Sequence, residues 1–97
     1  MLSKLLISKE LAILKKKIVV TGGAGFIGTN FIKRILKKNF QIINLDKLSK
    51  QSSPEYKYKQ KNYKFYKLNL VNKKQLKKKL FQIKPDIIIN FAAESHV

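Results

Sequence analysis

Four glycines lie close together at one point of this sequence, in Thr21-Gly-Gly-Ala-Gly-Phe-Ile-Gly28. Gly22 or Gly23 can make a tight turn, and at Gly25 the missing Cβ would let the backbone approach a pyrophosphate. Gly28 would let a following helix pack closely on the preceding strand. Unpaired N–H groups at the start of that helix would then donate to phosphate oxygens. The spacing predicts dinucleotide binding, with a plain tight turn as the alternative.

An acidic residue, Asp46, lies at the end of the next hydrophobic run, 18 residues after Gly28 (46 − 28). A dinucleotide-binding motif is expected to carry an acid about 20 residues after its glycines, where the carboxylate accepts hydrogen bonds from the adenosine ribose. The alternative is an ordinary turn residue at a strand end. A Walker-type phosphate loop is excluded, because no Gly-Lys-Ser/Thr follows the glycines.

A strand must precede these glycines and a helix must follow them. Ile18–Val20 is a short β-branched run of the kind found in buried strands. The helix is expected to open near Phe26, with Ile27, Phe31 and Ile35 on its apolar face. This arrangement would present the first helical N–H groups next to the glycine turn.

The remaining elements follow from the alternation of hydrophobic and polar stretches. We expect strands over 40–45, 63–70 and 86–92, a surface loop over 47–62, and a helix that starts after Asn72 and ends before Pro85. Leu76, Leu80 and Ile83 mark the apolar face of that helix. The run Ile87–Ile89 is typical of a parallel strand that is buried on both sides.

Right-handed crossovers would place these strands in a parallel sheet of order 3-2-1-4. The predicted fold class is therefore α/β, a Rossmann-type doubly wound parallel sheet of which only the first four strands are present. Residues 1–14 are interpreted as an N-terminal extension of uncertain structure. Residues 15–97 are interpreted as a partial NAD-binding Rossmann domain.

The net charge of +17 is extreme and raises the alternative of a basic, non-catalytic nucleic-acid-binding module. Lysines interleave with aromatic residues over 56–65, as in some single-strand binders. However, base readout and bidentate phosphate contacts favour arginine, and Arg34 is the one arginine in the chain. Compositional drift explains the charge better, and no specific nucleic-acid partner is expected.

The composition excludes several other kinds of site. The chain has no cysteine and a single histidine, His96, so neither a disulfide nor a metal site is expected. Its longest apolar runs, such as Leu11–Leu14, are far shorter than the roughly 20 residues of a membrane span. A cytoplasmic protein is therefore expected.

Three motifs together resemble the extended short-chain dehydrogenase/reductases: the glycine motif, Asn44-Leu-Asp-Lys-Leu-Ser49, and Asn90-Phe-Ala-Ala-Glu-Ser-His-Val97. Within that group they are most similar to the dTDP-glucose 4,6-dehydratase family, over residues 17–97. The resemblance implies NAD as cofactor. It also implies a lyase that converts dTDP-glucose and is a homodimer when full length. A related NAD-dependent nucleotide-sugar epimerase or decarboxylase is the alternative within the superfamily.

The resemblance also assigns cofactor contacts to individual residues. The pyrophosphate would border Phe26 and Ile27, the ribose Asp46 to Ser49, the adenine Asn69 and Leu70, and the nicotinamide half Phe91 to Ser95. With the glycines, the predicted cofactor-binding set is Gly22, Gly25, Phe26, Ile27, Gly28, Asp46, Lys47, Leu48, Ser49, Asn69, Leu70, Phe91, Ala92, Ala93, Glu94 and Ser95. Ser95 would also contact the sugar nucleotide.

No catalytic residue is expected in these 97 residues. Relatives use a Tyr-x-x-x-Lys pair on a helix, whereas the match here, Tyr63 to Lys67, lies in a predicted strand. Four residues of strand separate two positions by roughly 13 Å, too far for the lysine to act on the tyrosine. Glu94 and His96 are read as loop residues at a sheet edge. We therefore expect this chain to be the N-terminal part of such an enzyme and to be inactive alone.

Overall fold

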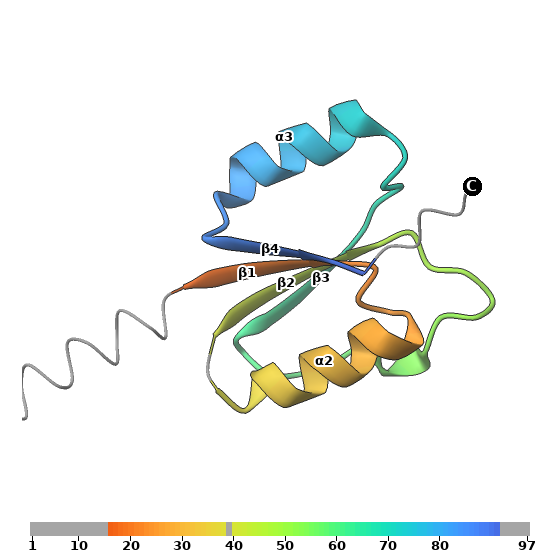
Figure 1. Ribbon diagram of the computed structural model, residues 1–97, viewed down its shortest axis with the longest axis vertical. Helices are drawn as coiled ribbons and strands as arrows, with labels where there is room; N and C mark the ends of the chain where they lie inside the picture. The colour runs from red at the N-terminus through yellow and green to blue at the C-terminus, as the bar shows by residue number, and fades with distance from the viewer. Residues whose placement is uncertain (1–15, 39, 92–97) are drawn as a thin grey trace, which may run out of the picture.

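Four parallel strands form one sheet, with a helix on each of its faces (Figure 1). The computed structural model describes residues 16–38 and 40–91. In chain order the elements are β1 (Lys17–Thr21), α2 (Phe26–Leu36), β2 (Gln41–Asp46), the 3-10 helix η1 (Pro54–Tyr56), β3 (Tyr63–Lys67), α3 (Lys73–Ile83) and β4 (Ile87–Asn90). The sheet order β3-β2-β1-β4 confirms the predicted topology and the Rossmann-type class.

Side chains that alternate along the strands divide the core into two layers. The layer beneath α2 contains Ile18, Val20, Ile32, Ile35, Leu36, Ile42 and Tyr63. The layer beneath α3 contains Val19, Ile43 and Leu45, with Leu76, Leu80 and Ile83 of the helix packed on them. The predicted apolar face of α3 is thus confirmed. Both faces of β1 and β2 are therefore covered, and the last residues of these two strands are buried.

The apolar face of α2 differs from the prediction at its first turn. Ile32, Ile35 and Leu36 are buried, but Ile27 is 66% exposed. The buried stripe runs through Gly28 and Ile32, and Ile27 lies about 100° away from Gly28 around the helix. The expectation that Ile27 shares the packed apolar face of the helix was therefore wrong, and its side chain lies at the surface beside the glycine turn.

The ends of α3 agree with the capping signals in the sequence. The Asn72 side chain accepts a hydrogen bond from the Gln75 N–H at 3.1 Å, as expected of an N-cap. Lys84, with φ of 55°, ends the helix in the left-handed region just before Pro85. Neither α2 nor α3, at eleven residues each, could cross a membrane, and within the described ranges no other helix could do so.

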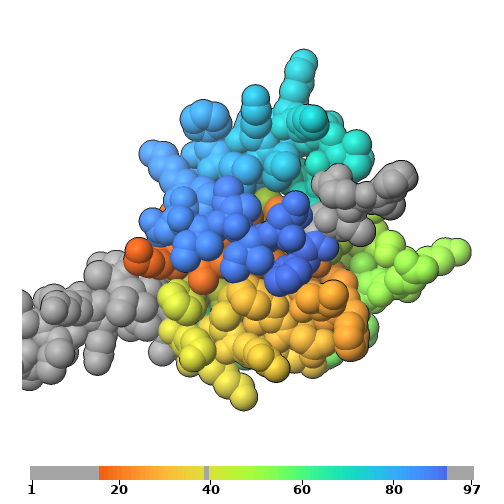
Figure 2. All heavy atoms as spheres, in the orientation of Figure 1, coloured from red at the N-terminus to blue at the C-terminus, as the bar shows by residue number. Residues whose placement is uncertain are grey.

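The strands on the two edges are shorter or more exposed than predicted. β3 ends at Lys67 and not at residue 70, and η1 lies inside the predicted surface loop. In β4, Ile87 is 42% exposed and Ile88 is 52% exposed, so the prediction of burial on both sides was wrong. The reason is that β4 pairs only with β1 among the described strands. Figure 2 shows β4 at the molecular surface.

Candidate dinucleotide-binding site

The glycine turn joins β1 to α2 at the carboxyl edge of the sheet, where open α/β folds bind their ligands. Gly22 makes the turn itself: its φ is 75°, a value that side chains disfavour. The Gly22 N–H donates to the Leu45 carbonyl at 2.9 Å, which fixes the turn to the end of β2. Of the two glycines that could make the turn, the structure therefore selects Gly22.

Gly23 and Gly28 are required by packing inside the protein. A Cβ at Gly23 would lie 2.3 Å from Oδ1 of Asn44 and 2.6 Å from Cδ1 of Ile32. A Cβ at Gly28 would lie 2.5 Å from the carbonyl oxygen of Gly22. Gly28 therefore packs against the glycine turn and not against the strand, which differs in detail from the expectation.

Gly25 is different, because nothing in the described structure requires a glycine there. Its φ and ψ of −76° and 175° suit any residue, and a Cβ would meet only the Gly22 carbonyl oxygen at an ordinary 3.5 Å. Gly25 is the N-cap of α2, yet no side chain caps the helix and its first turn has no acidic residue. The helix N-terminus is thus accessible to an anion from outside.

Asp46 holds two backbone segments at the end of β2. One carboxylate oxygen accepts the Ala24 N–H at 2.9 Å, and the other accepts the Leu48 N–H at 2.7 Å. The side chain is nearly buried, and each oxygen keeps one lone pair for a further donor. Asp46 thus places a carboxylate beside the glycine turn, as a ribose-binding acid requires, and it also anchors the turn itself.

The loop after Asp46 folds back onto the glycine turn. Leu48 has a positive φ of 63°, which redirects the chain directly after the strand. The Ser49 N–H donates to the Ser52 hydroxyl at 2.8 Å, and the Ser53 N–H donates to the Ala24 carbonyl at 2.7 Å. Lys47 and Ser49 remain exposed on this loop, where they can reach a ligand at the same edge.

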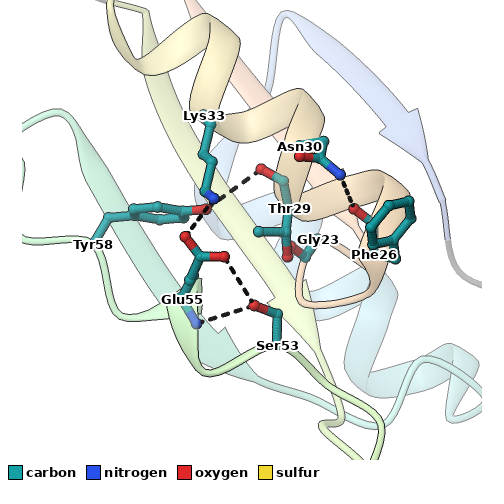
Figure 3. Close-up of polar contacts among 8 residues, drawn as sticks. All are labelled: Gly23, Phe26, Thr29, Asn30, Lys33, Ser53, Glu55 and Tyr58. Atoms are coloured by element: carbon teal, nitrogen blue, oxygen red, sulfur yellow. Dashed lines mark hydrogen bonds and ion pairs between the residues drawn. The ribbon is translucent and has the colours of Figure 1, made fainter.

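Polar contacts join η1 and the loop that follows it to α2 (Figure 3). Lys33 forms an ion pair with Glu55, and the Tyr58 hydroxyl donates to the Thr29 carbonyl at 3.4 Å. The Thr29 hydroxyl donates to the Gly23 carbonyl at 3.2 Å. The glycine turn, α2 and the loop before β3 therefore form one connected unit.

The roles of two residues of this site, Asn44 and Tyr63, were not predicted from the sequence. Asn44 is completely buried, and its Oδ1 accepts the Gly23 N–H at 3.0 Å while its Nδ2 donates to the Tyr63 hydroxyl at 3.0 Å. Burial raises the pKa of Tyr63 to about 12, so the hydroxyl stays protonated at physiological pH. The signal in the sequence was an amide within the apolar run of β2.

The remaining predicted contacts are only partly within the described residues. Asn69 and Leu70 follow β3, but the Asn69 side chain accepts the Val71 N–H at 3.1 Å and Leu70 packs in the layer beneath α3. Phe91 donates its N–H to the Thr21 carbonyl at 2.7 Å, and its ring packs on Phe31 with centroids 5.3 Å apart. The predicted contacts Ala92, Ala93, Glu94 and Ser95 lie outside the described residues, as does His96.

The described residues form neither a metal-binding cluster nor a helical Tyr-x-x-x-Lys pair. Tyr63 and Lys67 are the two ends of β3, so roughly 13 Å of strand separates them. The Tyr63 hydroxyl is engaged, since it donates to the Tyr56 carbonyl at 2.6 Å. This geometry agrees with the rejection of the Tyr63–Lys67 match as a catalytic pair.

Comparison with known proteins relates this geometry to enzymes that act on nucleotide sugars. The sequence model of the GDP-mannose 4,6 dehydratase family matches residues 19–97. A dTDP-D-glucose 4,6-dehydratase of Dictyostelium discoideum is 41% identical over 87 residues, which cover 84% of this chain and 20% of the relative. The chain therefore spans about a fifth of that relative's length.

Solved structures share the fold at similar levels of identity. The dTDP-glucose 4,6-dehydratase from Bacillus anthracis in complex with NAD has a TM-score of 0.72 and 36% identity, covering 82% of this chain and 27% of that one. The UDP-Glc/GlcNAc 4-epimerase from Campylobacter jejuni has a TM-score of 0.74 and 34% identity, covering 84% and 26%. Together with the match over residues 19–97, these likenesses show that the chain belongs to the GDP-mannose 4,6-dehydratase family.

Proposed function

We propose that this chain binds NAD at the carboxyl edge of its sheet, as the N-terminal part of a 4,6-dehydratase that acts on a nucleotide sugar such as dTDP-glucose. The observation that carries the proposal is Gly25. A glycine at an uncapped helix N-terminus, with no internal reason for its missing side chain, leaves room for a pyrophosphate. The NAD complex of the Bacillus anthracis relative supports the choice of ligand.

Each part of the cofactor would be held by a different set of the predicted contact residues. Backbone N–H groups at Phe26 and Ile27 would donate to the pyrophosphate oxygens, because α2 begins there. Asp46 would accept hydrogen bonds from the ribose hydroxyls on its free lone pairs, and Lys47 to Ser49 would border the same ribose. Asn69 and Leu70 would lie at the adenine, and Phe91 to Ser95 under the nicotinamide half, with Ser95 also near the sugar.

In the whole protein, bound NAD would supply the redox chemistry by accepting a hydride from the sugar and returning it. The residues of this chain would then bind and orient the cofactor without moving a proton themselves. The family match and the Dictyostelium relative favour this dehydratase over its alternatives. By resemblance to the same family, we also propose that the whole protein is homodimeric and cytoplasmic.

A nucleotide-sugar epimerase is the second candidate, favoured by the structural likeness to the Campylobacter enzyme. Both candidates need the same cofactor, so NAD binding by this chain does not separate them. Product analysis of the longer protein would do so: a dehydratase forms a 4-keto-6-deoxy sugar, whereas an epimerase returns a sugar of unchanged composition.

The test of NAD binding is a pair of substitutions at Gly25. In Gly25→Val the branched side chain would fill the space of the pyrophosphate, so we expect calorimetry to show affinity reduced by well over tenfold, about 1.4 kcal/mol or more. Circular dichroism should remain unchanged, because a Cβ there meets nothing closer than 3.5 Å. Gly25→Ala is the matched control, with a smaller loss. Undiminished NAD affinity in Gly25→Val would mean that the turn is merely structural.

A further inference from the structure

A buried chain of hydrogen bonds runs from the glycine turn to η1. The Gly23 N–H donates to Asn44 Oδ1 at 3.0 Å, Asn44 Nδ2 donates to the Tyr63 hydroxyl at 3.0 Å, and that hydroxyl donates to the Tyr56 carbonyl at 2.6 Å. The donor and the acceptor of each of these hydrogen bonds are fixed by chemistry. An N–H at Gly23 requires the amide oxygen of Asn44 to face it, which turns the amide nitrogen toward Tyr63. We call this chain of bonds the Asn44–Tyr63 relay.

Burial makes the Asn44–Tyr63 relay hard to replace. Asn44 is 0% exposed and Tyr63 is 7% exposed, so water cannot take over a lost contact there. Gly23 is also packed so tightly on Asn44 that an added Cβ would lie 2.3 Å from its oxygen. The position of the Gly23 backbone therefore depends directly on the position of the Asn44 side chain.

A second hydrogen bond, outside the Asn44–Tyr63 relay, also connects the glycine turn to η1. Tyr56 is the last residue of η1, and Ser53 is the N-cap of the same short helix. The Ser53 N–H donates back to the Ala24 carbonyl at 2.7 Å, next to Gly23 in the glycine turn. The turn and η1 are thus joined twice, once directly and once through β2 and β3. A shift of either one is transmitted to the other.

We infer that Asn44 and Tyr63 are positioning residues for dinucleotide binding, which set the glycine turn relative to the loop that follows Asp46. This inference rests on the proposed function. The turn would hold the pyrophosphate and the loop would border the ribose, so the distance between them must fit one ligand. Neither residue would touch the ligand, because both side chains are committed to the Asn44–Tyr63 relay.

The test is a double-mutant cycle in the whole 97-residue chain. Asn44→Leu removes both amide contacts while keeping the number and branching of the side-chain heavy atoms, and Tyr63→Phe removes only the hydroxyl. We expect NAD affinity to fall about tenfold in Asn44→Leu and about threefold in Tyr63→Phe. The double variant should bind about as weakly as Asn44→Leu alone, because both changes break one relay. Tyr66→Phe is the matched control, because Tyr66 lies in the same strand but packs beneath α3, away from the relay, and the NAD affinity of this variant should stay within about twofold.

Other results would separate this inference from the proposed function. All titrations are made well below the unfolding temperature, so a purely structural role would lower thermal stability without changing affinity. The positioning role would be contradicted by unchanged NAD affinity in Asn44→Leu and Tyr63→Phe. It would also be contradicted if the fold losses of affinity in the two single variants multiplied in the double variant. If the unmutated chain bound no NAD, the proposed function would fail instead. The relay would then be judged by amide exchange at Gly23, which must accelerate in both variants.

Discussion

At the scale of single residues, Asp46 serves the candidate site in two ways. Its oxygens already accept the N–H groups of Ala24 and Leu48, so the carboxylate orders the turn and the loop before any ligand arrives. The remaining lone pairs point to a ribose-binding role. A substitution there must therefore be read both as a lost ligand contact and as a loosened backbone.

The charge of Asp46 should make the chain prefer NAD over NADP. A 2′-phosphate would lie against the carboxylate, and like charges in a partly dry site repel. We expect calorimetry to give at least about tenfold tighter binding of NAD, a difference of about 1.4 kcal/mol. Asp46→Ala should weaken the binding of NAD and reduce the difference in affinity between NAD and NADP. Asp46→Asn, which removes the charge but keeps an acceptor, controls for the lost backbone contacts. Equal affinities for both cofactors in the unmutated chain would contradict this account.

At the scale of elements, the sequence was informative wherever local pattern and position agree. The β-branched run before the glycines, the cap at Asn72 and the stop at Pro85 predicted β1, α3 and the sheet order correctly. The burial of Ile27 was predicted wrongly because helical periodicity alone does not show which residues of the first turn face the sheet. The role of Asn44 was missed because it depends on Tyr63, a partner nineteen positions away in a neighbouring strand.

The edge strand β4 also shows where local pattern fails. Three isoleucines in a row predict burial on both sides, yet burial depends on which neighbours a strand has. Among the described strands β1 is its only partner, so Ile88 is half-exposed. The open edge of β4 can pair with another copy of the chain.

We expect Ile88→Lys to reduce association of the chain at high concentration. A lysine on an exposed edge strand opposes pairing, and little core packing is lost because Ile88 is already 52% exposed. Sedimentation velocity at increasing concentration is the measurement. Val71→Lys is the matched control, since Val71 is 79% exposed but lies outside the sheet. Equal effects of the two substitutions would show that added charge, and not the β4 edge, governs association.

At the scale of the whole molecule, we propose that this chain supplies a cofactor site and that the groups performing the reaction belong to the longer protein. Its one Tyr-x-x-x-Lys match lies along β3, with Tyr63 buried and hydrogen-bonded. We therefore expect no 4-keto sugar from dTDP-glucose when the 97-residue chain is assayed with added NAD. Turnover above background that disappears in Tyr63→Phe would contradict both the rejection of this pair and the assignment of catalysis to the longer protein.

The net charge of +17 affects every binding experiment on this molecule. It attracts any anion, and a groove at the opposite, amino edge of the sheet is lined by Lys17, Lys61, Lys64 and Lys79. NAD carries phosphates, so weak binding there would imitate specific binding at the glycine turn. Moderate salt screens such attraction, with a Debye length of about 8 Å at physiological ionic strength. An experiment must therefore locate the ligand as well as detect it.

Two-dimensional NMR of the chain, titrated with NAD at physiological salt, shows directly whether NAD binds at the glycine turn. We expect saturable shifts of the backbone amides from Gly22 to Ile27 and from Asp46 to Ser49, with little change around Lys61 and Lys64. Inorganic pyrophosphate at equal concentration is the control, and it should move the glycine-turn amides but not those after Asp46. No shifts at the glycine turn, or shifts confined to the lysine-lined groove, would contradict the account.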